Sequence, residues 1–262
     1  MELQPRLIEV QVPERPEGVV VVLHGGGARR VRMMVSPTQL SVLRMIPVAR
    51  RVARAGRERL AVFRLLNSVR GWDAHHTPVR DAEWALDGIA ERLGGTRPTC
   101  LVGHSLGGRA ALLAAGRPEI SSVVALAPWV LPTDVPPGLG DARILFVHGD
   151  RDRIASRSRA VALAREVGRR ADVGFVTVEG GSHSMLRHHA IFDGLAAEFA
   201  ATTLLGTESS GALARIDAGE AWVTVCDRPG SVRPHVAAMG VREHRARPRA
   251  PGRDGRRHAR TR

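Results

Sequence analysis

Residues 99–108 read Thr-Cys-Leu-Val-Gly-His-Ser-Leu-Gly-Gly, an apolar run followed by a glycine-flanked serine and a helix-forming stretch. A G-x-S-x-G motif between a strand and a helix is typical of a nucleophile elbow, a tight, strained turn that exposes the serine hydroxyl. Only residues with little or no side chain fit beside such a serine, and Gly103 and Gly107 meet that need. The motif alone fits a structural turn equally well, so the rest of the chain must decide whether Ser105 is a nucleophile.

Apolar runs of strand length recur along the chain and alternate with helix-like segments. The runs are 19–23, 61–66, 99–102, 122–126, 144–147 and 173–178, and most are continuously apolar. Such runs are typical of strands buried on both faces of a parallel sheet. Amphipathic patterns and stop signals predict helices over 81–93, 106–115, 156–167 and 185–202. This order predicts an α/β fold with a mostly parallel, doubly wound sheet flanked by helices.

The strand and helix pattern covers residues 6–205 and decays after them. We therefore predict a catalytic domain over residues 1–205 and an Arg-, Pro- and Gly-rich C-terminal extension over 206–262, disordered from about residue 227. Seventeen residues, four of them proline, connect the runs 122–126 and 144–147. This connection is too short for a large helical lid, so only a minimal cap is expected.

The net charge of +13 is concentrated at the C-terminus. All 39 basic residues are arginine, and residues 228–262 hold eleven of them against two acidic residues, so this segment carries +9. A GC-biased coding sequence explains a lysine-free, arginine-rich chain more simply than selection for a basic surface does. The segment also lacks aromatic residues on which bases could stack. A nucleic-acid partner is therefore not expected, although binding to nucleic acid or an anionic membrane is the functional alternative.

The chain carries no sign of export or of membrane insertion. The N-terminus lacks a basic segment followed by an apolar one, and no apolar run reaches the roughly 18 residues that a membrane span needs. Cys100 and Cys226 are the only cysteines, so a disulfide framework is not indicated. These features predict a cytoplasmic protein.

His24-Gly25-Gly26-Gly27 closes the run 19–23, at the end of the sheet where open α/β folds place their ligands. Backbone N–H groups of Gly25, Gly26 and Gly27, together with that of Leu106, are candidate oxyanion-hole donors. A glycine-rich turn or a phosphate loop is the alternative, but no Gly-Lys-Ser/Thr follows.

An acid and a base for Ser105 follow two later strands. His148-Gly149-Asp150-Arg151-Asp152 ends the run 144–147, and its carboxylates compete for the role of orienting a histidine. We favour Asp152, which lies further into the loop, whereas Asp150 is suited to capping the turn. His183 lies in the loop after the run 173–178 and is the candidate general base.

The remaining histidines give no sign of a metal site. The pairs His75-His76 and His188-His189 are interpreted as surface residues, because no carboxylate or cysteine recurs at ligand spacing. Neither a metal nor a cofactor is predicted.

The chain order Ser105, Asp152, His183, with His24-Gly25-Gly26-Gly27 upstream, resembles the α/β-hydrolase superfamily over about residues 6–205. The resemblance implies a serine–histidine–acid triad and an acyl-enzyme mechanism. It also favours Asp152, since the family commonly places its acid two residues after the first Asp of a His-Gly-Asp-x-Asp run. The compact, lidless layout looks most like small dienelactone-hydrolase or carboxylesterase-like members.

The predicted function is a serine hydrolase that cleaves a carboxylic ester or thioester of a small or medium-sized substrate. An acyltransferase using the same residues and a non-catalytic binding or regulatory protein on this fold are the alternatives. We expect the pocket to be lined by residues 36–47, 71–73 and 128–130. Trp72 and Trp129 would then contact an apolar group, although buried tryptophans are more often core residues. Nothing in the sequence specifies the oligomeric state.

Overall fold

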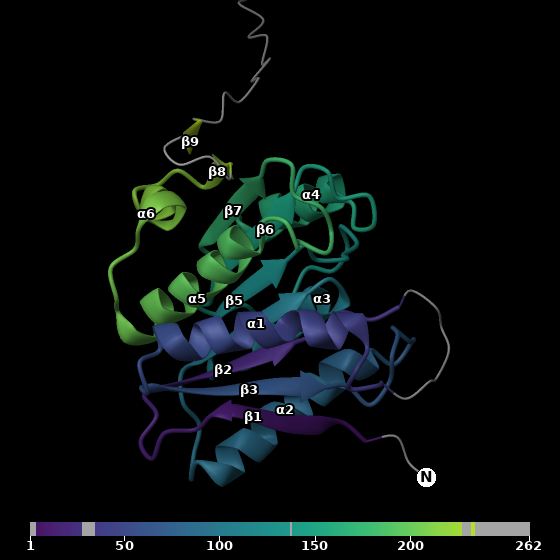
Figure 1. Ribbon diagram of the computed structural model, residues 1–262, viewed down its shortest axis with the longest axis vertical. Helices are drawn as coiled ribbons and strands as arrows, with labels where there is room; N and C mark the ends of the chain where they lie inside the picture. The colour runs from purple at the N-terminus through teal and green to yellow at the C-terminus, as the bar shows by residue number, and fades with distance from the viewer. Residues whose placement is uncertain (1–3, 28–34, 137, 227–231, 234–262) are drawn as a thin grey trace, which may run out of the picture.

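The computed structural model describes residues 4–27, 35–136, 138–226 and 232–233 (Figure 1). Its middle layer, within these residues, is a nine-stranded sheet with the strand order β1-β3-β2-β4-β5-β6-β7-β8-β9. The strands are β1 (Arg6–Gln11), β2 (Gly18–Leu23), β3 (Leu60–Leu66), β4 (Thr99–His104), β5 (Ile120–Leu126), β6 (Arg143–Gly149), β7 (Val173–Val178), β8 (Trp222–Val225) and β9 (Val232–Arg233). Only β1 and β9, at the two edges, run antiparallel to their neighbours. The predicted fold class is therefore confirmed.

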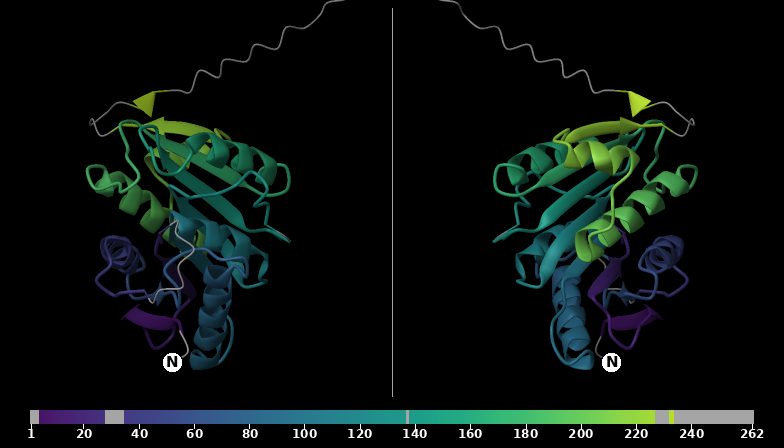
Figure 2. Two further views of the ribbon diagram at one scale, coloured as in Figure 1. Left: turned by 90° about the vertical axis from the view of Figure 1, so that its right-hand side faces the viewer. Right: turned by 90° about the vertical axis from the view of Figure 1, so that its left-hand side faces the viewer.

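Helices cover both faces of the sheet (Figures 1 and 2). One face carries α1 (Leu40–Ala55), α5 (His189–Leu205) and α6 (Gly211–Asp217). The other carries α2 (Thr77–Arg92), α3 (Leu106–Leu113) with the short 3₁₀ helix η1 (Ala114–Gly116), and α4 (Arg157–Val167). Because helices pack on both of its faces, the inner strands of the sheet are continuous apolar runs in the sequence.

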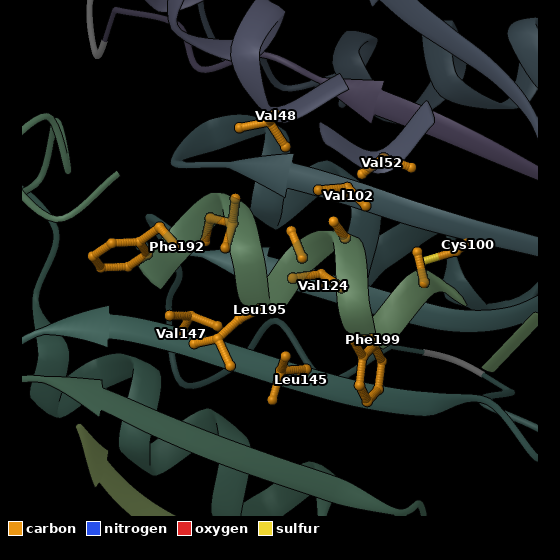
Figure 3. Packing of buried hydrophobic residues seen from close by; sticks show 14 of the residues in the cluster. Val48, Val52, Cys100, Val102, Val124, Leu145, Val147, Phe192, Leu195 and Phe199 are labelled. Atoms are coloured by element: carbon orange, nitrogen blue, oxygen red, sulfur yellow. The ribbon is translucent and has the colours of Figure 1, made fainter. Parts of the chain in front are cut away.

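The core alternates between the two faces residue by residue. In β2, Val20 and Val22 pack under α1 and α5, whereas Val19 and Val21 point to the opposite cluster. Figure 3 shows how α5 packs on the first face, with Leu195 and Phe199 on the side of the helix that meets the strands; Phe192 is fully buried in the same cluster. Burying each large side chain of this kind contributes about 2 kcal/mol, so the sheet is held from both sides.

Helix α1 was not predicted from the sequence, which led us to expect only that residues 36–47 line the pocket. Its buried residues are Val42, Met45, Val48, Ala49, Val52 and Ala53, a spacing typical of one helical face. Pro47 lies inside the helix. Because proline removes a backbone hydrogen bond there, its presence in the sequence argues against a helix over this segment.

The domain continues past residue 205, where the sequence predicted its end. Helix α6 places Leu213 and Ile216 in the core, and β8 adds Val223 beside β7. Ile216 packs so closely on β7 that a methyl group on Gly174 would lie 2.8 Å from its Cδ1. The boundary at 205 is thus corrected to at least Val225. Apart from β9, the residues predicted to be disordered from about 227 lie outside the described part of the chain.

The last predicted helix begins later than expected. Met185, its predicted first residue, is fully buried and has a φ of 56°, a left-handed conformation that a helix cannot continue. Helix α5 starts at His189 instead, which leaves residues 179–188 as a loop above the carboxyl ends of β6 and β7. In the described part of the chain, no helix has the length and apolarity that crossing a membrane requires.

Candidate active site

Ser105 occupies a strained turn between β4 and α3. Its φ of 55° and ψ of −118° lie in a region that residues other than glycine rarely adopt. The turn is closed backbone against backbone, because a Cβ on Gly103 would lie 2.2 Å from the Gly107 carbonyl oxygen. A Cβ on Gly107 would lie 2.5 Å from the carbonyl oxygen of Leu23. The two glycines therefore permit the turn, and β2 packs directly on it.

The loops after β4, β6 and β7 bring Ser105, His183 and Asp152 into one chain of contacts. Ser105 Oγ lies 3.0 Å from His183 Nε2, and His183 Nδ1 lies 2.8 Å from Asp152 Oδ2. The Nδ1–H group donates to the carboxylate, which leaves the Nε2 lone pair facing the serine hydroxyl. All three residues lie at the carboxyl ends of parallel strands, where this fold class places its sites.

The Asp152 side chain is fully buried but richly hydrogen-bonded. Its Oδ1 accepts the N–H groups of Ile154 and Ala155 at 2.8 and 2.9 Å, and His148 Nε2 lies 3.2 Å from Oδ2. Burial raises the pKa of Asp152, but the hydrogen bonds from His148, His183 and Ala155 outweigh it, so the pKa falls below its ordinary value. The carboxylate therefore stays ionised and able to hold a positively charged His183.

The competing carboxylate has a different partner. Asp150 Oδ1 accepts the backbone N–H of Gly180 at 2.7 Å and lies on the exposed side of the loop. This bond ties the turn after β6 to the loop that carries His183. Asp150 thus caps a turn, while Asp152 faces the histidine.

Two side chains that the sequence analysis did not single out hold the backbone around His183. His104 Nε2 lies 2.9 Å from the His183 carbonyl oxygen, and Arg44 Nε donates to the Ser184 carbonyl at 2.9 Å. Burial, with a smaller contribution from the charge of His183, lowers the pKa of His104 to about 3. His104 is therefore neutral and donates from Nε2. Arg44 also forms a buried ion pair with Asp193 at 2.8 Å, which anchors it to α5.

His24 fixes the peptide group between Gly25 and Gly26. Its Nε2 accepts the Asn67 N–H at 3.1 Å, so Nδ1 carries the hydrogen and donates to the Gly25 carbonyl at 2.6 Å. In a trans peptide the N–H group points opposite to the carbonyl. The Gly26 N–H is therefore directed away from His24.

The predicted oxyanion donors differ in what their N–H groups already bind. Gly27 donates its N–H to the Arg70 carbonyl at 3.1 Å, so it is withdrawn from the set. No described residue accepts the N–H of Gly25, Gly26 or Leu106. Gly25 lies against the serine, since a Cβ there would be 3.2 Å from Ser105 Cβ.

A pocket of about 820 Å³ opens above Ser105. Trp72 and Trp129 both line it, and so does the first half of α1. The Arg109 guanidinium lies 4.1 Å from the ring centre of Trp72 and 5.6 Å from that of Trp129. Its Nη2 also binds Asp134 at 2.7 Å, so the charge of Arg109 is both stacked and paired.

The paired histidines take no part in the chain of contacts that joins Ser105, His183 and Asp152. His75, His76 and His189 are exposed and His188 is half-buried, while His189 borders the pocket. Among the described residues, no three side chains of the His, Cys, Asp or Glu types gather where they could hold a metal ion.

A model of the alpha/beta hydrolase family matches residues 20–258. The chain belongs to this family. The resemblance inferred from the motifs is thus confirmed at the level of the superfamily.

Solved structures with the same fold are distant in sequence. A putative alpha/beta hydrolase from Agrobacterium tumefaciens is 18% identical, with a TM-score of 0.59 over 78% of this chain and 94% of that one. Est1E from Butyrivibrio proteoclasticus with ferulic acid bound is 17% identical, with a TM-score of 0.55 over 77% and 96%. A hyperthermophilic esterase from Pyrobaculum calidifontis is 16% identical, with a TM-score of 0.56 over 76% and 81%. At these identities the likeness establishes the fold alone. No curated protein sequence matches the chain.

Proposed function

We propose that this alpha/beta hydrolase is a serine esterase or thioesterase that works through an acyl-enzyme intermediate. The observation that carries the proposal is the unbroken path from Ser105 Oγ through the His183 ring to Asp152, with contacts of 3.0 and 2.8 Å. A nucleophile, a base and an orienting carboxylate in that order are the three groups that acyl transfer requires.

In the first half-reaction His183 Nε2 takes the hydroxyl proton as Ser105 Oγ attacks the carbonyl carbon. The carbonyl oxygen becomes an oxyanion, and the N–H groups of Gly26 and Leu106, with that of Gly25, are our candidate donors to it. His183 then gives its proton to the departing alcohol or thiol, and an acyl-serine remains. Asp152 stabilises the imidazolium throughout.

In the second half-reaction a water molecule attacks the acyl-serine. His183 Nε2 removes a proton from the water, and a second oxyanion forms at the same place. When it collapses, Ser105 Oγ leaves and regains its proton from His183, so the carboxylic acid is released and the enzyme is restored.

The first test is labelling with a fluorophosphonate probe, followed by mass spectrometry of the modified peptide. We expect an adduct on Ser105 that disappears in a Ser105→Ala variant. Ser184→Ala is the matched control, because Ser184 lines the same pocket but only its carbonyl is used, by Arg44. A folded wild-type protein that never reacts would contradict the proposal and favour a binding protein on this fold.

A second measurement separates hydrolysis from acyl transfer. Release of p-nitrophenol from p-nitrophenyl acetate is followed with and without an added alcohol, and the products are identified. We expect acetate as the main product. A new ester as the main product would identify an acyltransferase instead.

A further inference from the structure

Exposed apolar side chains gather at one place on this protein. In the part of the chain that the structure describes, the exposed large hydrophobic residues are Leu40, Leu43, Trp84, Ile154 and Leu186. All of them except Trp84 line the pocket above Ser105. We define Leu40, Leu43, Ile154 and Leu186 as the apolar rim. Clustered exposed apolar residues mark binding sites far more often than single ones do.

The apolar rim is assembled from separate segments. Leu40 and Leu43 come from the first turn of α1, Ile154 follows Asp152, and Leu186 follows His183. Leu40, Ile154 and Leu186 each expose more than three-fifths of their surface, at 83%, 68% and 64%. Residues this far apart in the chain meet only because the fold brings their loops to one opening. The opening leads to the serine.

The interior of the pocket continues the same chemistry. Below the rim, Pro47, Leu106, Trp72 and Trp129 provide apolar walls. The two arginines that line it are each neutralised, Arg44 by Asp193 and Arg109 by Asp134, and all four side chains are at least nine-tenths buried. The part of the lining that the structure describes therefore offers a charged substrate no unpaired arginine, aspartate or glutamate.

We propose that this pocket binds an extended aliphatic chain, so that the substrate is an ester or thioester of a medium- or long-chain fatty acid. The inference rests on the proposed hydrolase function and specifies its substrate class. The volume of about 820 Å³ is near the upper end of ordinary small-molecule sites and far exceeds what an acetyl group fills. An aliphatic chain on the acyl group at Ser105 would lie in this pocket and cover exposed side chains of the apolar rim.

The test is kcat/KM for p-nitrophenyl acetate, butyrate, hexanoate and octanoate, all below their micellar concentrations. Burying one more methylene group is worth up to about fourfold, so we expect octanoate to exceed acetate at least tenfold. In a Leu40→Ser/Leu186→Ser double variant the ratio of octanoate to acetate should fall at least fivefold.

Trp84→Ser is the matched control. Trp84 is also an exposed large hydrophobic residue, 46% accessible, but it lies on α2 and does not line the pocket. Its ratio should equal that of the wild-type protein. Thermal unfolding of each variant checks that the folded state is retained.

Each other outcome overturns a different statement. If acetate and butyrate are cleaved but kcat/KM falls towards octanoate, the aliphatic-chain inference is wrong and the hydrolase function stands. If a preference for octanoate arises only above the micellar concentration, the rim docks on a lipid surface rather than binding a single chain. If no ester is cleaved and the fluorophosphonate leaves Ser105 unmodified, the hydrolase function itself is wrong.

Discussion

The floor of the site, which we define as Ser105, His104 and Asp152, has enclosed side chains, whereas at the rim of the pocket Leu40 and Leu186 expose most of their surface. The floor is polar, and hydrogen bonds from several loops restrain its groups. The rim is apolar and is held only by the segments that carry it. This difference indicates that chemistry and substrate choice are separable: changes at the floor should alter catalysis and stability, and changes at the rim should alter specificity alone.

The largest effect on kcat should come from Asp152, and Asp150, in the same loop after β6, is the matched control. In Asp152→Asn the amide can no longer accept from His183 Nδ1–H with a negative charge, and kcat should fall about 10³- to 10⁴-fold. In Asp150→Asn the side-chain oxygen can still accept the Gly180 N–H, so kcat should stay within about threefold of the wild-type value. Steady-state kinetics on p-nitrophenyl acetate decide between them. Equal losses would mean that both carboxylates only hold the loop.

A smaller effect, on stability, should follow when the closed turn at the floor is opened. Gly103→Ala puts a methyl group against backbone atoms that cannot rotate away, so the free energy of unfolding should fall by about 3 kcal/mol. Gly88→Ala is the control, because a Cβ there meets nothing within 4 Å and lies inside α2. It should raise the free energy of unfolding by up to about 1 kcal/mol. Urea titrations of both variants measure the difference, and a stable Gly103→Ala protein would show that the turn is loose.

The pH dependence of stability should report the buried neutral His104. Its folded pKa of about 3 lies below the ordinary value of 6.5, so between these values the unfolded chain binds a proton that the folded protein does not. The contribution of His104 to the free energy of unfolding is therefore fully present above about pH 6.5. It declines as the pH falls, by up to about 1.4 kcal/mol per pH unit.

In His104→Gln the amide can still donate to the His183 carbonyl but does not titrate. The slope of the unfolding free energy between pH 6 and pH 4.5 should therefore be shallower than in the wild type. It should not vanish, because burial also lowers the pKa of His24. Equal slopes would mean that His104 becomes protonated in the folded state.

The smallest effect on stability is expected at the rim. Leu40→Ser removes a side chain that is 83% exposed at the start of α1, so the free energy of unfolding should change by less than about 0.5 kcal/mol. The midpoint of thermal unfolding measures it. A large loss would show that Leu40 packs on the protein, and the contrast between floor and rim would fail.

Where a structural need is local, the sequence was sufficient to predict it. The strand β2 is recognisable in the sequence as an apolar run because all of its residues are buried. The turn at Ser105 is recognisable because the neighbouring backbone leaves room only for glycine at positions 103 and 107. The order of Ser105, Asp152 and His183 along the chain resembles that of the α/β-hydrolase superfamily, and this resemblance implied that their loops meet.

Contacts between distant segments had no such signal. The sequence did not reveal that His104 and Arg44 hold the backbone at His183, or that the Gly27 N–H is taken by the Arg70 carbonyl. Helix α6 and β8 fall within the predicted extension, because both are short and only their packing beside β7 makes them part of the domain.

The sequence by itself therefore determined the layered α/β architecture and predicted the candidate nucleophile and base, while it left two carboxylates in competition for the acid, with Asp152 favoured. The tertiary structure alone decided which carboxylate faces His183, which glycine N–H groups remain available, and that Leu40, Ile154 and Leu186 meet at one opening. The physical reason is range: periodicity and backbone sterics act within a few residues, whereas hydrogen bonds and apolar contacts between loops depend on how the folded chain brings remote segments together.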